Sequence, residues 1–191
     1  LHTLGQLLGK DRSRAKEAEE LLRRSIEIGE ENNHQHDVAQ RLHTLGQLLG
    51  KDRSRAKEAE ELLRRSIEIG EENNHQHDVA QRLHTLGQLL GKDRSRAKEA
   101  EELLRRSIEI GEENNHQHDV AQRLHTLGQL LGKDRSRAKE AEELLRRSIE
   151  IGEEIKHYHH QAQALHTLGQ LLGKDRSRAK EAEELLRRSI E

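Results

Sequence analysis

Residues 1–41 read LHTLGQLLGKDRSRAKEAEELLRRSIEIGEENNHQHDVAQR, and this stretch recurs unchanged at residues 42–82 and 83–123. A fourth copy with six substitutions fills residues 124–164, and a fifth, partial copy fills residues 165–191. A repeat of about 20–50 residues is typical of solenoids, propellers and arrays, in which each unit packs only on its neighbours. We therefore expect a single repeat array over residues 1–191.

Each repeat predicts two helices joined by polar turns. On the first helix, expected over about residues 37–49, the apolar positions share one face: Val38, Leu42, Leu45 and Leu49. A second apolar run from Ala56 to Ile69 has the same period, and Ser54 before it is a favoured N-cap, so a second helix is expected over about residues 54–72. No stretch alternates with a two-residue period, so the expected fold class is all-α.

The apolar stripe of each helix pair must be covered by a neighbouring repeat, because one pair alone leaves its leucines in water. Charged residues are expected on the outer face of the second helix. There Glu60 precedes Arg64, and Glu61 precedes Arg65, in the favourable i,i+4 order.

Composition excludes several classes of function. The chain has no cysteine, so it has neither disulfides nor thiolate metal sites, and its net charge of −2 gives no basic surface for nucleic acid or acidic lipid. No apolar run is long enough for a membrane span or a leader, and we expect a cytoplasmic protein. No serine lies in a nucleophile-elbow setting and no strand would position one, so catalysis is not expected.

The spacing of small and apolar residues resembles the tetratricopeptide repeat. Leu42-x2-Leu45-Gly46-x2-Leu49 is followed by Ala59-x3-Leu63-x2-Ser66, with leucine in place of each aromatic residue and no closing proline. The 41-residue period exceeds the usual period of about 34 and resembles that of kinesin light chains. The resemblance implies a right-handed superhelical solenoid of helix-turn-helix repeats that acts as a non-catalytic protein-interaction scaffold. It also implies close helix contacts at Gly46, Ala59 and Ser66.

The resemblance further implies a concave groove, lined by the first helices, that binds a peptide or a partner protein. Carried over position by position, the partner-binding residues are Gln40, His43, Thr44, Gln47, Lys51, His84, Gln88, His125, Gln129, His166 and Gln170. If the histidines take part, an acidic ligand should bind more tightly as the pH falls from 8 to 5. The alternative is that these residues are solvated surface, repeated by duplication.

Histidines also gather between repeats, in His34-Gln35-His36-Asp37, its copies and the variant His157-Tyr158-His159-His160. Imidazole and carboxylate groups are ligands for zinc, nickel or copper. Because His-x-His on a helix points to different faces, only a turn or a neighbouring repeat could complete a ligand set. We expect polar turn residues here, without a bound metal or other cofactor.

Both ends of the sequence fall inside a predicted helix. Leu1 corresponds to Leu42 in the first helix, and Glu191 lies within the second. Uncapped repeat ends leave apolar surface that another copy can cover. The alternative function is therefore a structural, self-stacking array without a ligand groove, formed by end-to-end association.

Overall fold

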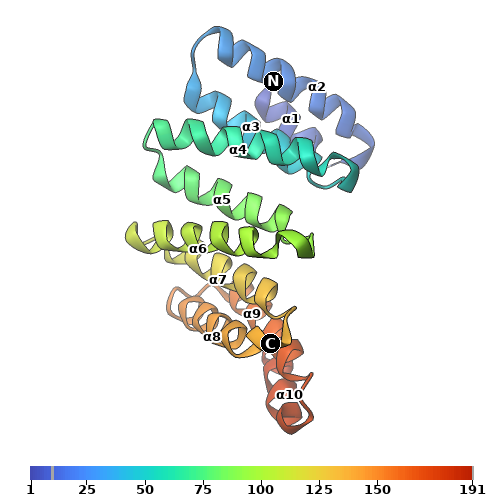
Figure 1. The fold of residues 1–191 in the computed structure, drawn as a ribbon, viewed down its shortest axis with the longest axis vertical. Helices are drawn as coiled ribbons and strands as arrows, with labels where there is room; N and C mark the ends of the chain where they lie inside the picture. The colour runs from blue at the N-terminus through green and yellow to red at the C-terminus, as the bar shows by residue number, and fades with distance from the viewer. Residues whose placement is uncertain (10, 191) are drawn as a thin grey trace. The chain divides into compact units, whose positions relative to one another are not determined.

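The computed structural model describes residues 1–9 and 11–190, and it divides the chain into two compact units, Leu1–Lys92 and Asp93–Glu191. The first unit contains five α-helices in which consecutive helices pack on each other (Figure 1). They are α1 (His2–Leu8), α2 (Ala15–Glu31), α3 (Gln35–Leu49), α4 (Ala56–Glu72) and α5 (Gln76–Leu90), with short 3-10 helices η1 (Arg12–Arg14) and η2 (Arg53–Arg55).

The second unit repeats the same pattern. Its helices are α6 (Ala97–Glu113), α7 (Gln117–Leu131), α8 (Ala138–Glu154), α9 (Tyr158–Leu172) and α10 (Ala179–Arg188), with η3 (Arg94–Arg96), η4 (Arg135–Arg137) and η5 (Arg176–Arg178) before the second helices. No strand occurs in residues 1–9 or 11–190, which confirms the all-α prediction. Within the same residues, no helix is both long enough and apolar enough to cross a bilayer. That all five copies form one array stays a prediction.

The ends of both helices agree with the sequence, but their starts differ: the first helix begins at Gln35 rather than near residue 37, and the second begins later than predicted. The prediction that Ser54 is the N-cap of a helix over residues 54–72 is wrong. Instead Asp52 caps η2, because its Oδ1 accepts hydrogen bonds from the backbone N of Ser54 at 2.9 Å and from Ser54 Oγ at 2.8 Å. The α-helix then begins at Ala56.

The turn between one repeat and the next depends on a left-handed backbone residue. Asn33 and Asn74 have φ of 56° and 55°, a conformation that asparagine tolerates better than most residues. In the fourth copy Lys156 occupies this position with φ 55°, so the divergent junction keeps the turn with a residue less suited to it.

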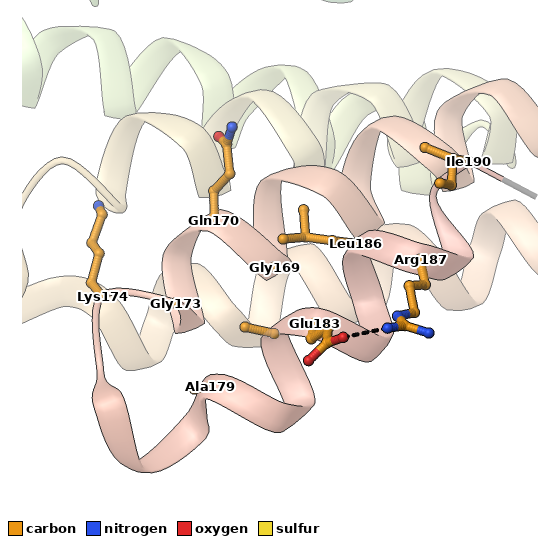
Figure 2. Close-up of a pocket in the computed structure, with 10 residues that line it drawn as sticks. Gly169, Gln170, Gly173, Lys174, Ala179, Glu183, Leu186, Arg187 and Ile190 are labelled. Carbon is orange, nitrogen blue, oxygen red and sulfur yellow. Dashed lines mark hydrogen bonds and ion pairs between the residues drawn. The ribbon is translucent and has the colours of Figure 1, made fainter.

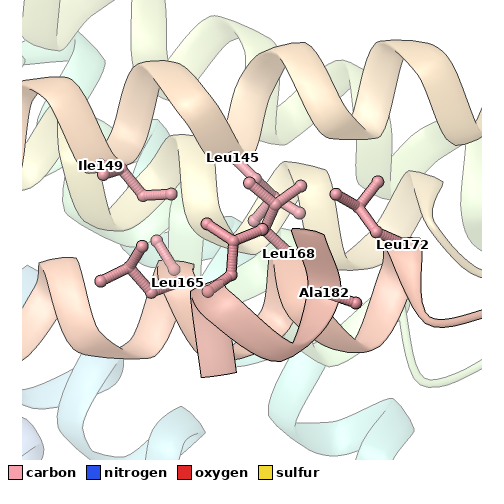
Figure 3. Packing of buried hydrophobic residues seen from close by; sticks show 8 residues of the cluster. Leu145, Ile149, Leu165, Leu168, Leu172 and Ala182 are labelled. Atoms are coloured by element: carbon pink, nitrogen blue, oxygen red, sulfur yellow. The ribbon is translucent and has the colours of Figure 1, made fainter. Parts of the chain in front are cut away.

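The predicted apolar stripes form the core. In the first unit Leu42, Leu45 and Leu63 have at most 1% of their surface exposed. In the second unit a continuous cluster joins α8, α9 and α10 (Figure 3), and it consists of Leu145, Ile149, Ala164, Leu165, Leu168, Leu172, Ala182 and Leu185. Within the units, α3 therefore packs between α2 and α4, α7 between α6 and α8, and α9 between α8 and α10.

The small residues lie where helices approach closely, as predicted. A Cβ on Gly46 would lie 2.8 Å from Leu63 Cγ and 3.2 Å from the carbonyl oxygen of Ala59, so α3 and α4 meet too closely for any side chain there. Ser66 is fully buried, and its Oγ donates to the carbonyl oxygen of Ala39 at 2.6 Å. Ser66 thus fills its small site and also joins the two helices by a hydrogen bond.

A lysine from each repeat reaches back to the end of the preceding first helix. Lys51 Nζ donates to the carbonyl oxygen of Gly9, the C-cap of α1, at 3.1 Å, and Lys92 Nζ donates to that of Gly50, the C-cap of α3, at 2.9 Å. In the second unit Lys174 Nζ donates to Gly132 at 3.0 Å. A positive charge at the carboxyl end of a helix is favourable, so these contacts join successive repeats.

Ion pairs join the second helices of successive repeats. Glu19 binds both Arg23 (2.8 Å) and Arg55 (2.9 Å), and Glu58 closes the network by pairing with both arginines. The Glu60–Arg64 pair forms at 2.8 Å as predicted.

The predicted pairing of Glu61 with Arg65 is wrong. Arg65 instead pairs with Glu30 of the preceding repeat at 2.6 Å. Packing of successive second helices brings the more distant carboxylate within reach. Part of the outer charge therefore holds repeats together rather than solvating one helix.

Candidate functional site

The first helices of the first unit carry a row of polar residues, which we call the polar strip: Gln6, Gln40, Thr44, Gln47, Gln81, Thr85 and Gln88. The glutamines of the polar strip are exposed, and the threonines are partly buried. Gln6 Nε2 donates to Thr44 Oγ1 at 3.5 Å, and Gln47 Nε2 donates to Thr85 Oγ1 at 3.4 Å. The strip is therefore continuous from α1 through α3 to α5 within this unit.

His43 lies beneath the polar strip rather than on it. It is only 8% exposed, and its Nε2 is 2.9 Å from Thr85 Oγ1 of the next repeat. Burial, aided by the charge of Arg82 and opposed by that of Asp78, lowers the pKa of His43 to about 4. The side chain is thus a neutral contact between repeats near pH 7, and it does not supply the charge change between pH 8 and pH 5 that the sequence led us to expect.

The other histidines of the predicted groove do not form a uniform row. His84 is 8% exposed, whereas His166 is exposed. His125 is partly buried, its Nε2 lies 2.8 Å from Thr167 Oγ1, and burial lowers its pKa. The assignment of these histidines to partner binding stays a prediction, and of the three only His166 is exposed.

The glutamines keep the exposure that a binding role requires. In the second unit Gln129 and Gln170 are exposed, and Gln170 Nε2 lies 2.9 Å from His166 Nε2. Lys51 is exposed as well, but its amine is engaged by Gly9. The chemistry offered at this surface is therefore that of primary amides, which donate and accept hydrogen bonds without a charge.

A buried arginine was not singled out from the sequence. Arg82 is 2% exposed, its Nη1 donates to the carbonyl oxygen of Ser66 at 3.2 Å, and its Nη2 lies 3.6 Å from Asp78. Burial lowers its pKa. The signal in the sequence was the i,i+4 pair of Asp78 and Arg82, which indicates an ion pair but not its burial between α4 and α5.

The structure brings histidines of successive repeats together at the inter-repeat turns. His36 Nδ1 lies 3.0 Å from His75 Nδ1 and 3.7 Å from Asp78 Oδ2. In the second unit His118 Nε2 lies 3.1 Å from His157 Nε2, and His160 completes the group. The neighbouring repeat, which sequence reasoning named as a requirement for a ligand set, does supply further imidazoles in both units.

Comparison with known proteins agrees with the repeat pattern. The sequence profile of the tetratricopeptide repeat matches residues 1–72 and 78–154. Among solved structures, BtubC (BKLC) from P. vanneervenii is similar, with a TM-score of 0.78 and 17% identity over 92% of this chain and 72% of that chain.

A circular tandem repeat protein with novel repeat topology and enhanced subunit contact surfaces aligns with a TM-score of 0.47 and 21% identity, over 98% of this chain and 54% of that chain. Among curated proteins, no sequence match was found. The likeness to BtubC concerns the fold alone, and it agrees with the paired helices and short turns described above. With its profile matched over more than half of its length, this all-α repeat solenoid belongs to the tetratricopeptide repeat family.

Proposed function

We propose that the chain is a non-catalytic protein-interaction scaffold that binds an extended peptide along the polar strip. Tetratricopeptide repeats generally mediate protein–protein interaction or scaffolding. The observation that carries the finer proposal is the row of exposed glutamines on the first helices, joined from repeat to repeat by hydrogen bonds to threonine.

The chemistry of the polar strip favours a peptide backbone as ligand. A primary amide offers both a donor and an acceptor, which matches the N–H and C=O groups of an extended chain. The chain has one tyrosine and no tryptophan or phenylalanine, so large aromatic anchors contribute little. Affinity then depends on several repeats engaging one ligand at the same time, so a longer peptide should bind more tightly than a short one.

The test begins with peptides selected from a random library on the immobilised chain, followed by measurement of Kd in solution. Gln88→Arg in the polar strip should weaken binding of the selected peptides. The matched control is Gln76→Arg, because Gln76 is also exposed and lies at the start of the same helix, α5. If both variants bind the selected peptides equally well, and the parent chain binds shortened peptides as tightly as long ones, the polar strip is not the binding surface.

A second candidate function, end-to-end stacking, rests on a repeated leucine contact. A Cβ on Gly9 would lie 3.3 Å from Leu48 Cδ1 of the next repeat, and a Cβ on Gly50 would lie 3.2 Å from Leu89 Cδ1. Each of these leucines therefore packs on a glycine in the hairpin before it. Leu7 holds the same repeat position in α1, and it is 61% exposed.

In the hairpin of α9 and α10, no leucine among residues 1–9 and 11–190 lies against Gly173, the equivalent of Gly9 and Gly50. Gly169, Gly173, Ala182, Leu186 and Ile190 line a pocket between α9 and α10 (Figure 2). We infer that Leu7 of a second copy fills this pocket, in the way that Leu48 and Leu89 pack within the chain.

Light scattering across a range of protein concentrations tests this stacking. Mass should rise with concentration, and Leu7→Lys should abolish the rise. Tyr158→Lys is the control, because Tyr158 is also a large exposed residue, at 73%, and does not line the pocket. A monomer at every concentration would refute end-to-end stacking and leave the peptide-binding proposal untouched.

A further inference from the structure

Each unit contains, within itself, a group of metal-ligand side chains at an inter-repeat turn, and each of these two groups draws on two repeats. In the first unit His36 lies in the first turn of α3, His75 is the N-cap of α5, and Asp78 lies in the first turn of α5. In the second unit the group consists of His118 in α7, the α9 N-cap His157, and His160 in α9. Within each group, one ligand atom from every residue lies within 4.8 Å of the others.

The spacing of the first group suits a single small cation. Tetrahedral coordination with bonds of 2.0–2.1 Å places ligand atoms about 3.3–3.4 Å apart. The distances from His36 Nδ1 to His75 Nδ1, 3.0 Å, and to Asp78 Oδ2, 3.7 Å, fall on either side of that value. The two rings are nearly perpendicular, at 82°, with centroids 4.5 Å apart, so their nitrogen edges converge without stacking.

The second group keeps the same repeat positions through the most divergent part of the sequence. The fourth copy changes six residues, at positions 155, 156, 158, 160, 161 and 164, but His157 is retained. Position 160, equivalent to Asp78, becomes histidine, so one metal-ligand type replaces another. The set therefore remains three ligands, although the neighbouring Val79 and Arg82 positions become Gln161 and Ala164.

Two further features of the second group, one of His160 and one of His118, fit a metal site. His160 is 8% exposed, and its Nδ1 has no hydrogen-bond partner among the described residues. His118 Nε2 faces His157, while its Nδ1 lies 3.3 Å from Asp119 Oδ1. A carboxylate on the far nitrogen of an imidazole is the usual second-layer partner of a metal-bound histidine, since it fixes the tautomer and orientation of the ring.

We propose that each group binds one divalent transition-metal ion of the zinc type, which ties the amino-terminal ends of consecutive first helices together. Three protein ligands leave the fourth position to water. In the second unit, ligation through His157 Nε2 requires a proton on Nδ1. Protonated Nδ1 can no longer accept the long 3.4 Å hydrogen bond from the backbone N of His160, so metal binding breaks that bond. The competing explanation is a plain N–H···N hydrogen bond between the paired rings.

The second group is tested by calorimetric titration of the full chain, produced without a histidine tag, with Zn²⁺ alone. A His36→Ala/His77→Ala background removes the equivalent histidine from the earlier repeats. In that background His160→Ala should lower Zn²⁺ affinity about tenfold or more. His159→Ala is the matched control, since His159 is in the same segment but its Nε2 contacts Gln163 instead.

The first group allows a test by gain of affinity. In a His77→Ala/His118→Ala background, Asp78→His should recreate the three-imidazole set and raise Zn²⁺ affinity. Asp37→His is the matched control, because Asp37 pairs with Arg41 as Asp78 does with Arg82 but is outside both groups.

Two readouts separate a built site from loose binding to surface histidines. Bound Co²⁺ should show the intense visible absorption of tetrahedral coordination, and Zn²⁺ should raise the melting temperature of the parent chain but not of the His160→Ala variant to the same extent. Equal effects of His159→Ala and His160→Ala, absence of saturable binding, or an octahedral Co²⁺ spectrum would overturn the proposal and leave the N–H···N hydrogen bond.

Discussion

The buried His43 predicts that the fold loses stability in mild acid. Its pKa falls from the ordinary value of 6.5 to about 4 because burial disfavours the charged ring and Arg82 adds repulsion. The contribution of neutral His43 is therefore complete above pH 6.5, is lost progressively as the pH falls from 6.5 to 4, and is fully lost below 4. Between pH 7 and pH 5 the expected loss is about 2 kcal/mol in the free energy of unfolding, from this residue alone.

The assay is urea unfolding followed by far-UV circular dichroism at pH 7 and pH 5, for the parent chain and for His43→Gln. Glutamine can still bond to Thr85 but does not titrate. Other histidines with lowered pKa, such as His125, add to the total acid loss, so the difference between the two proteins isolates His43. An equal acid loss in both proteins, or an NMR titration of His43 with a pKa near 6.5, would refute the reasoning.

Three further predictions concern packing, each read from the urea midpoint. Leu45→Ala should lower the free energy of unfolding by about 2–5 kcal/mol because the side chain is fully buried. Leu4→Ala, at the same repeat position but 47% exposed, should lower it by less than half as much, and equal losses would contradict nearest-neighbour stacking. Gly46→Ala should destabilise by up to about 2 kcal/mol, since crowding against Leu63 at 2.8 Å exceeds the gain in helix propensity, and unchanged stability would show that the helices separate freely. Ser66→Ala should cost about 1 kcal/mol through the lost bond to the Ala39 carbonyl, and a gain in stability would refute that role.

Most of the fold could be predicted from one repeat because its apolar positions have a helical period and its turns contain nothing to bury. The start of the second helix was placed two residues too early, since Ser54 and Asp52 are both good caps and only the structure shows that Asp52 accepts the hydrogen bonds. The choice depends on the short 3-10 turn, which has no strong signature in sequence.

The candidate site was less predictable because it depends on contacts between repeats. His43 has the same polarity as Gln47, and nothing in a single helix shows that Thr85 of the next repeat covers one and leaves the other exposed. The convergence of His36 with His75 has the same origin, since the two residues are 39 positions apart. Exposure of the glutamines could be anticipated, because they lie opposite the leucine stripe.

The lysine contacts between repeats can form only in the order in which the chain is synthesised. Lys51 completes the carboxyl end of α1 from 42 residues further along the chain, so at usual rates of synthesis the amine follows the carbonyl by about 2–8 s. The lysine of a newly synthesised repeat thus binds the carboxyl end of the first helix in the repeat before it. We expect these contacts to form in the order in which the repeats leave the ribosome.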